Sequence, residues 1–298
     1  MAPVNTCRWS KRPSLAGARF ESLSHVVAQS DLDAERFLAL GARPVSVSGN
    51  LKVDTTAPPC DAAELARLKE QIGSRNTWAA ISTFEGEDEI AAAVHRALYQ
   101  RHKQLTILVP RHPDRADAIE TMLDQRGLKV ARRSRGDQID PSTDVYLGDT
   151  IGEMGLYLNL TEIAFVGKSL KGGGGQNPLE PAMLGTAILS GPNVSAFTEA
   201  YEKLTEARGA RIVDDEATLA KTVHHLLSQP KVCEAMARAG ARVVEDMGGA
   251  LDRTWQALDP YIHPLRVQAA LRTDGPEFRP SSGASGVGSA RRSALGWK

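Results

Sequence analysis

Short apolar segments alternate along most of the chain with longer segments of mixed polarity. The apolar segments are rich in β-branched residues, as in "TWAAIS" and "QLTILVP", and they predict buried strands. The longer segments repeat apolar residues at three- and four-residue spacing, which predicts amphipathic helices. This alternation is typical of an α/β fold with a mostly parallel sheet that is covered on both faces.

The regular pattern begins with a short strand through Val26 and Val27. A helix follows, with Ser30 or Asp31 as its N-cap and Gly41 as its C-terminal glycine. Further strands are expected in residues 43–50, 77–82, 104–110, 129–134, 144–149, 163–167, 187–191 and 211–213. Helices are expected in residues 61–73, 83–102, 111–127, 150–160, 177–185, 194–209, 214–229, 230–249 and 250–262.

This pattern predicts three parts of the chain. Residues 48–278 form a doubly wound, Rossmann-like domain, whose regular core ends near Ser228 and whose last two helices close it. Residues 1–47 form a separate N-terminal segment. Residues 279–298 are rich in Ser, Gly and Arg and lack periodicity, so we expect a disordered tail.

Composition excludes several classes of function. The 36 basic and 36 acidic residues cancel, which removes the global electrostatic case for a nucleic-acid partner. The three cysteines are far apart, so neither a disulfide framework nor a structural zinc site is expected, and no cofactor motif is visible. No apolar run is long enough for a membrane span, and the N-terminus lacks the apolar region of a signal peptide.

Candidate ligand-binding residues follow the predicted strands, because ligands of open α/β sheets bind beyond the carboxyl ends of strands. Thr83 is placed to cap the helix that follows it, ahead of a cluster of Glu and Asp. Arg111 and His112 directly follow another strand. The Arg guanidinium can grip a phosphate and His can add a donor. A well-capped helix and a solvated basic loop are the alternatives at these two places.

Two further helix starts carry stronger patterns. Thr150 and Glu153 have the spacing of a capping box, which predicts a helix whose free N–H groups form an anion site. The stretch "KGGGGQNPLEPAMLG" combines four glycines with Asn177 as N-cap, Pro178 as the first helical residue and Glu180 in the first turn. The glycines allow the backbone to approach a ligand. The alternative is a flexible surface loop.

The charges of the candidate residues then indicate which of them would bind the ribose and which the phosphate of a nucleotide. Glu180 would repel a phosphate, so its carboxylate suits the hydroxyls of a ribose, while Arg111 and backbone N–H groups suit the phosphate. Other polar residues have plainer interpretations. We expect the helical histidines and the basic cluster "ARRSRG" to lie at the solvated surface; these histidines are His95, His102, His224 and His225.

Taken together and in this order, "SGNLKVD", "STFEGEDE", "VPRHPDR", "LGDTIGEMGLYL" and "GGGQNPLEPAMLG" resemble the 3-deoxy-D-manno-octulosonic acid (Kdo) transferases of lipid A biosynthesis. The resemblance runs from about residue 5 to about residue 272. It implies a GT-B fold and transfer of Kdo from CMP-Kdo to a lipid A precursor, lipid IVA, at the cytoplasmic side of the inner membrane.

The resemblance also implies roles for single residues. Lys52 matches a position near the cleft between the two GT-B domains. The expected CMP-binding residues are Pro110, Arg111, Ile151, Gly152, Glu153, Asn177, Pro178, Leu179 and Glu180. At three positions this chain departs from the family: Phe84 and Gln176 stand where His is common, and Lys168 replaces a usual Gly.

The larger departure concerns the N-terminal domain, which in the family carries the membrane anchor, the acceptor site and the general-base glutamate. The resemblance implies that residues 1–47 are a remnant of that domain, so no catalytic residue is assigned here. Two interpretations stay open: an enzyme that is incomplete as written, or an inactive CMP- or CMP-Kdo-binding module that needs a separate N-terminal half. Another GT-B transferase or a nucleotide-sugar epimerase is a weaker third.

Overall fold

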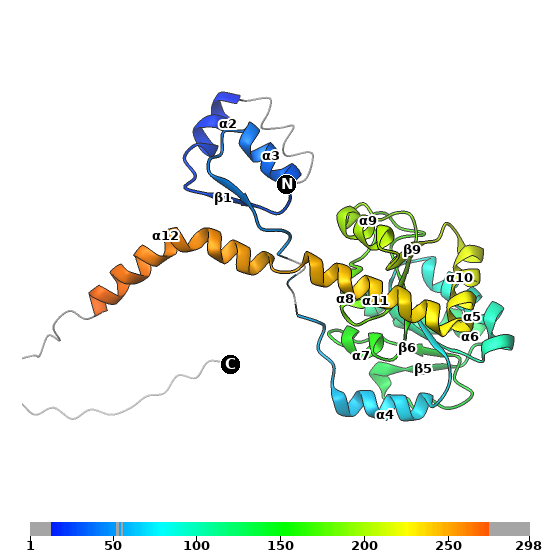
Figure 1. The fold of residues 1–298 in the computed structure, drawn as a ribbon. Helices are drawn as coiled ribbons and strands as arrows, with labels where there is room; N and C mark the ends of the chain where they lie inside the picture. The colour runs from blue at the N-terminus through cyan, green and yellow to red at the C-terminus, as the bar shows by residue number, and fades with distance from the viewer. Residues whose placement is uncertain (1–12, 52–53, 55, 274–298) are drawn as a thin grey trace, which may run out of the picture. The chain divides into compact units, whose positions relative to one another are not determined.

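A computed structural model describes residues 13–51, 54 and 56–273 (Figure 1). Lys52 and the predicted tail at 279–298 lie outside the described residues. The chain divides into two compact units at the junction of Thr254 and Trp255. The last helix, α12 (Ala250–Thr273), runs through this junction and contains Pro260 and Pro264.

The N-terminal part contains two helices, α2 (Pro13–Phe20) and α3 (Asp31–Ala39), and two strands, β1 (Val26–Ala28) and β2 (Val45–Val47). The strands pair in parallel, with Val26 opposite Val45. Ser30 is the N-cap of α3, since its Oγ accepts a hydrogen bond from the Asp33 N–H at 3.2 Å. This confirms the first of the two expected caps. A small core of Phe20, Val26, Leu40 and Ala42 holds these elements together.

The main body is built on a seven-stranded sheet with the order β5-β6-β4-β3-β7-β8-β9, and all of its pairings are parallel. The strands are β3 (Thr77–Thr83), β4 (Leu105–Pro110), β5 (Val130–Arg132), β6 (Val145–Leu147), β7 (Ile163–Val166), β8 (Ala187–Ser190) and β9 (Ala210–Ile212). The chain crosses from β6 over to β7, beside the central β3. The expected doubly wound α/β fold is confirmed.

Helices cover both faces of this sheet (Figure 1). One face packs against α4 (Ala62–Ile72), α7 (Met154–Leu158), α8 (Leu179–Met183), α9 (Thr198–Glu206) and α11 (Pro230–Met247). The other face packs against α5 (Glu87–His102), α6 (Ala116–Gln125) and α10 (Glu216–Ser228). Short 3-10 turns lie at Pro113–Arg115 and Arg133–Arg135.

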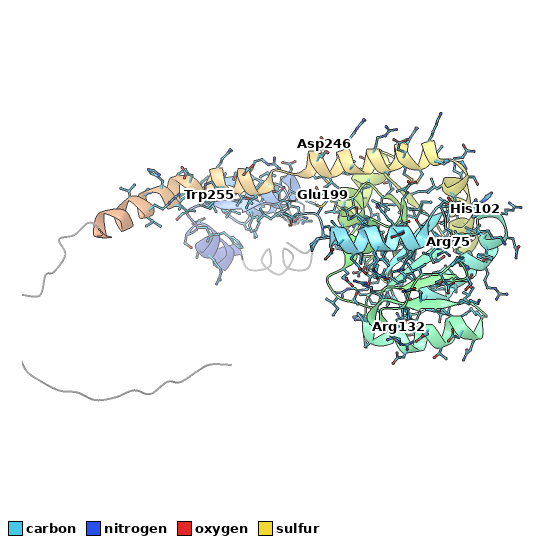
Figure 2. All side chains as sticks on the ribbon, turned by 90° about the horizontal axis from the view of Figure 1, so that it is seen from below. Arg75, His102, Arg132, Glu199, Asp246 and Trp255 are labelled. Atoms are coloured by element: carbon cyan, nitrogen blue, oxygen red, sulfur yellow. The ribbon has the colours of Figure 1, made fainter. Side chains whose placement is uncertain are left out.

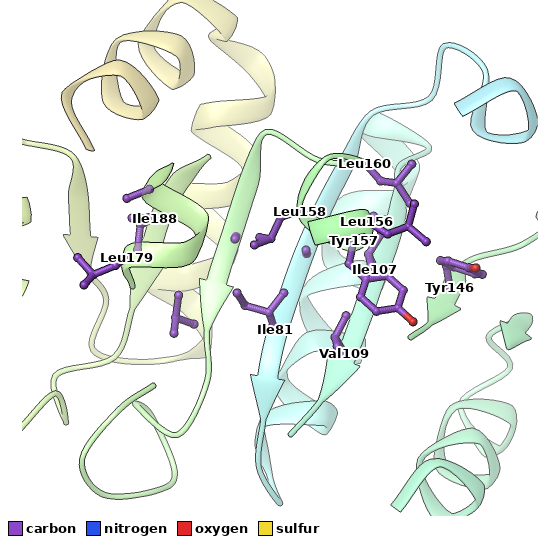
Figure 3. Close-up of a cluster of buried hydrophobic side chains, with 14 of the residues drawn as sticks. Ile81, Ile107, Val109, Tyr146, Leu156, Tyr157, Leu158, Leu160, Leu179 and Ile188 are labelled. Atoms are coloured by element: carbon purple, nitrogen blue, oxygen red, sulfur yellow. The ribbon is translucent and has the colours of Figure 1, made fainter. Parts of the chain in front are cut away.

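Neighbouring residues of one strand serve opposite cores, because side chains alternate across a sheet. Ile81 faces the α7–α8 side together with Ile107 and Leu158, as Figure 3 shows. Trp78 and Ala80 of the same strand face the α5 side. Because both faces of the strands are buried, the strands read as continuous apolar runs. The same burial fixes the position along the sheet at which each strand ends.

Several helix starts differ from the sequence-based expectation, and three of them shape the carboxyl edge of the sheet. Helix α5 begins at Glu87, after Gly86 in a left-handed conformation, so Thr83 is not its cap. Instead Thr83 ends β3 and donates a hydrogen bond of 2.6 Å to Asp88. Helix α7 begins at Met154 rather than Thr150, and α9 begins at Thr198. In each case the residues before the helix form a loop at the carboxyl edge of the sheet.

The histidine prediction was also wrong in part. His95 is 1% exposed and its Nδ1 lies 2.9 Å from Thr106 Oγ1. His102 Nε2 lies 2.7 Å from His224 Nδ1, which joins α5 to α10. His95 thus joins α5 to β4, and His102 with His224 joins two helices; none of these rings lies at the carboxyl edge of the sheet.

Candidate functional site

A cavity of about 530 Å³ opens at the carboxyl edge of the sheet, a size within the range of small-molecule pockets. Its walls come from the ends of four strands and the segments that follow them. They are Ser82 near the end of β3, Pro110 at the end of β4 with Arg111 to Asp114 after it, Thr150 to Gly152 after β6, and Gln176, Asn177 and Glu180 after β7. Ile81, Val109, Met154 and Tyr157 close its floor.

A bulge at the end of β3 shapes this floor. Ile81 pairs with Val109 and Thr83 pairs with Pro110, so Ser82 is an extra residue between two regular pairs. Ser82 has a φ of +52°, which is rare for a residue other than glycine. Bulges bend a strand and redirect its side chains, and here Ser82 joins the lining of the cavity. Sequence reasoning missed Ser82, because residues 77–82 read as one regular strand with Ser82 as its last residue.

Arg111 supplies the free cation of the cavity. Its backbone N–H donates to the Thr83 carbonyl oxygen at 3.0 Å, which fixes the start of the loop. Within the described part of the chain, its exposed guanidinium has no carboxylate partner. His112 beside it contacts the Phe84 ring edge to face, with 5.4 Å between centroids. A guanidinium that no protein carboxylate neutralises is suited to an anionic ligand.

The loop after β6 contributes backbone and one apolar side chain. Gly152 has a φ of +85° with open space around its Cα, and Ile151 is 87% exposed at the rim. The expected capping box is absent: Thr150 donates a hydrogen bond to the Glu153 carboxylate, but Glu153 is itself the N-cap of a helix that begins at Met154. With only five residues, α7 offers no extended set of N-terminal N–H groups.

Glu153 is engaged by Arg133, which donates from Nε at 3.0 Å and from Nη2 at 2.6 Å. These hydrogen bonds lower the pKa of Glu153 against the opposing effect of burial, and Thr150 adds to the lowering. The carboxylate lies outside the lining of the cavity. Of the expected binding residues it is therefore one whose side chain already has partners.

The segment after the glycines brings two polar side chains to the cavity. Asn177 Oδ1 accepts from the Leu179 N–H at 3.1 Å, and its Nδ2 donates to Glu180 Oε1 at 3.4 Å. Helix α8 begins at Leu179 with Pro178 as its N-cap, one residue later than expected. Pro178 and Leu179 are buried behind the site, and Leu179 also lines an adjoining cavity with residues 195–200.

The structure thus brings six of the expected residues to one cavity: Pro110, Arg111, Ile151, Gly152, Asn177 and Glu180. Glu153, Pro178 and Leu179 stand behind these residues. Glu87 is a further residue that sequence reasoning treated only as part of a helical first turn. It is fully buried and bonds to the glycine-rich loop.

The basic cluster "ARRSRG" is not a solvated edge. Arg132 bonds to Asp117, Glu120 and Asp149, and its side chain is 12% exposed. Figure 2 labels Arg132 on the main body. Arg133 also bonds to Glu64. Burial raises the pKa of Asp149, but hydrogen bonds from Ser134 and Arg132 outweigh it and leave the pKa below its usual value. We call the contacts of Arg132 and Arg133 the arginine network.

Among the described residues, no group of three or more His, Cys, Asp or Glu side chains could hold a metal ion. In the same part of the chain, no helix is both long and apolar enough to cross a membrane.

Comparisons with known proteins point to one family. A family described as 3-deoxy-D-manno-octulosonic-acid transferase (kdotransferase) matches residues 1–55. The 3-deoxy-D-manno-octulosonic acid transferase of Haemophilus influenzae is 33% identical over 264 residues, which cover 86% of this chain and 61% of that protein. The corresponding protein of Bordetella pertussis is 35% identical, over 84% of this chain and 58% of its own. This chain therefore spans about three-fifths of these relatives.

A solved structure matches the main body. The C-terminal CMP-Kdo binding domain of WaaA from Acinetobacter baumannii is 30% identical, with a TM-score of 0.58. The match covers 61% of this chain and 96% of that domain.

Proposed function

We propose a donor-binding role from the premise that this chain belongs to the 3-deoxy-D-manno-octulosonic acid (Kdo) transferase family: its α/β domain binds CMP-Kdo at the carboxyl edge of the sheet. The observation that carries the proposal is the convergence of six expected residues from three loops on one cavity. A matching solved domain is named for CMP-Kdo binding, which supports the same ligand.

The chemistry of the cavity suggests how a cytidine monophosphate group lies in it. Arg111 pairs with the phosphate, because its guanidinium has a free planar fork of donors. Glu180 accepts hydrogen bonds from the ribose hydroxyls, and Asn177 steadies the Glu180 carboxylate. Ile151 covers a face of the base, and the Gly152 backbone approaches the base edge.

We propose further that the complete enzyme is a glycosyltransferase that moves Kdo from CMP-Kdo to a lipid A precursor, lipid IVA, at the cytoplasmic side of the inner membrane. The acceptor hydroxyl must lose its proton during attack, so such a reaction needs a placed base. Lys52, which lies outside the described residues, belongs to this proposal through its match to a family position near the interdomain cleft.

One observation favours a narrower second candidate, a binding module without its own base. In residues 13–51 the two strands β1 and β2 are followed by Gln29 and Ser48, and neither carries a carboxylate. Under this alternative the chain holds CMP or CMP-Kdo and a separate N-terminal half supplies the chemistry.

Isothermal titration of the 298-residue chain with CMP, and with UMP as control, tests the donor site. We expect CMP to bind and UMP to bind at least tenfold more weakly. Arg111→Ala and Glu180→Ala should each weaken CMP binding about tenfold or more, because each removes hydrogen bonds to a charged group. Arg238→Ala, in an exposed ion pair on α11, is the matched control and should bind normally.

Unchanged CMP affinity in both Arg111→Ala and Glu180→Ala would overturn the assignment of the cavity. The DNA upstream of the codon for Met1 distinguishes the two candidates. An open reading frame that encodes a further Rossmann-like half favours the enzyme, and a promoter with a ribosome-binding site directly before Met1 favours the module.

A further inference from the structure

Glu87, the first residue of α5, is fully buried and faces only backbone donors. Its Oε2 accepts from the N–H groups of Phe84 at 3.0 Å and Lys168 at 2.6 Å. Its Oε1 accepts from Ser169 at 2.9 Å, Leu170 at 3.0 Å and, more weakly, Lys171 at 3.4 Å. Among the described residues no cationic side chain pairs with it.

The four donors from Lys168 to Lys171 are consecutive, and they begin the glycine-rich loop that ends at Gln176. Successive N–H groups can converge on one anion where right- and left-handed residues adjoin or in a turn, and Lys168 has a φ of +58°. Such a concave arrangement usually binds an external anion. Here the protein's own carboxylate fills it, so the loop is ordered before any ligand arrives.

The far end of the loop is fixed separately, because the Tyr201 hydroxyl donates to the Gln176 carbonyl oxygen at 3.2 Å. At the near end, Asn193 Nδ2 donates to the Ser169 carbonyl oxygen at 3.0 Å. The four glycines lie between these anchors. Because both ends are held, the glycines take one path, and the residue that follows the loop is the cavity-lining Asn177.

We propose that Glu87 is the positioning residue of the donor site: it orders the 168–176 loop and thereby places Asn177 and Glu180 at the cavity. Glu87 does not line the cavity, so it acts through the loop rather than on the ligand. The proposal rests on the proposed function, since it takes Asn177 and Glu180 to be donor-binding residues.

The backbone N–H groups around its carboxylate make Glu87 hard to replace. A carboxylate offers about four acceptor sites, whereas the amide of Gln offers one acceptor oxygen and a pair of N–H donors. In Glu87→Gln the side-chain N–H groups of the amide would therefore face backbone N–H groups, and neither can accept a hydrogen bond. In Glu87→Asp the charge remains but is withdrawn by one methylene group, which lengthens the contacts to Lys168 and Leu170.

Hydrogen exchange of the ligand-free protein is the first test, because it reports on the loop without any nucleotide. In Glu87→Gln we expect the amides of residues 168–171 to exchange at least a hundredfold faster than in the wild type. The matched control is Asp144→Asn. That carboxylate accepts the Lys129 N–H at 2.9 Å at the amino edge of the sheet, so its loss should leave the loop amides within threefold of the wild type.

CMP titration of the same variants is the second test. We expect Glu87→Gln to bind CMP at least tenfold more weakly and Asp144→Asn to bind within threefold of the wild type. A merely structural role would weaken both variants in proportion to their loss of thermal stability. If Glu87→Gln does not fold, Glu87→Asp replaces it, with the same direction of change expected in both measurements.

The outcomes separate this proposal from the proposed function. Unchanged exchange of residues 168–171, or faster exchange with unchanged CMP affinity, overturns the positioning role and leaves the donor site intact. Failure of the wild type itself to bind CMP overturns the donor site, and the positioning role falls with it. Fast exchange together with weak CMP binding, in Glu87→Gln but not in Asp144→Asn, supports the proposal.

Discussion

Two loop regions at the carboxyl edge of the sheet are held in opposite ways. At the start of the glycine-rich loop after β7, the backbone N–H groups converge on one buried carboxylate, that of Glu87. The region around β5 and β6 depends on the arginine network, in which several guanidinium and carboxylate groups share the contacts. The first arrangement concentrates the hold on one residue, and the second distributes it over many side chains.

The difference has a physical consequence. A buried carboxylate among backbone dipoles is shielded from salt and cannot be exchanged for another side chain without loss. A partly exposed network tolerates the loss of one contact, because the remaining charges still pair, but it responds to salt and pH. The single carboxylate of Glu87 therefore favours one rigid backbone path. The arginine network favours a region that keeps its structure when one contact is lost.

The largest effect is expected from a steric clash with the glycine-rich loop. A Cβ added at Gly191 would collide with the Ser169 carbonyl group and would lie 2.6 Å from the Leu170 nitrogen. We expect Gly191→Ala to lower the free energy of unfolding by about 3 kcal/mol, since only backbone could move aside. Urea denaturation measures the change.

Gly173→Ala is the control for this substitution, because a Cβ at Gly173 would meet nothing within 4 Å. It should change the free energy of unfolding by less than about 0.5 kcal/mol. Equal losses in the two variants would contradict a fixed loop path.

A smaller loss should follow from Arg132→Ala in the arginine network. The Asp149 carboxylate would keep the Ser134 N–H at 2.9 Å and the Ser134 hydroxyl at 2.6 Å but lose its cation. We expect a loss of about 2 kcal/mol in the free energy of unfolding. Lys203→Ala, in an exposed pair with Glu199, should cost less than about 0.5 kcal/mol in the same urea experiment. An equally small loss for Arg132→Ala would show that the arginine network does not stabilise the folded protein.

Acid should affect the arginine network selectively. Hydrogen bonds from Arg67, against the effect of burial and with help from Arg133, lower the pKa of Glu64 to about 2. The unfolded chain then binds more protons than the folded chain between pH 4.5 and pH 2. The stability contributed by Glu64 is therefore full above pH 4.5 and is lost as pH falls through this window.

Urea denaturation at pH 5 and pH 3 checks this pH dependence. Arg133→Ala should lose less stability between these two pH values than the wild type, because Glu64 and Glu153 would titrate closer to their usual pKa values. An identical loss in the wild type and the variant would refute the assignment.

The smallest expected effect concerns Lys168, the strained residue of the glycine-rich loop. Lys168→Gly relieves the left-handed backbone but adds freedom to the unfolded chain, and it removes the contact of Nζ with the Phe84 ring at 5.1 Å. We expect a net change within about 0.5 kcal/mol. Lys168→Ala loses the same contact and keeps the strain, so it should be about 1 kcal/mol less stable than Lys168→Gly. Equal stability of the two would show that the backbone there is not strained.

The sequence was sufficient for the fold because the signals of the fold are local. "LTILVP" is apolar throughout since both faces of β4 are buried, and Gly73 and Gly41 end helices as expected. The candidate site was partly predictable for the same reason. Arg111 and Glu180 directly follow strands or their loops, and the parallel sheet brings these loops to one edge.

What the sequence did not predict depends on contacts between distant segments. Nothing near Glu87 indicates that its carboxylate meets the backbone of residues 168–171 instead of capping its own helix. The charges of Arg132 and Arg133 looked solvated because their carboxylate partners lie on α4, α6 and the loop after β6. The start of α5 was misplaced because Thr83 bonds to Asp88 instead of to a backbone N–H.

The pairing of β3 with β7 also sets an order of events during synthesis. Strands β3, β4, β5 and β6 are made together, but Ala79 reaches its partner Ala164 only after β7 has left the ribosome. One flank of the central strand therefore stays unpaired while half of the sheet is complete. The walls of the cavity belong to both halves, so the site should be the last part of the domain to acquire structure. Pulse-labelled hydrogen exchange during refolding should show protection at β4 before protection at residues 168–171.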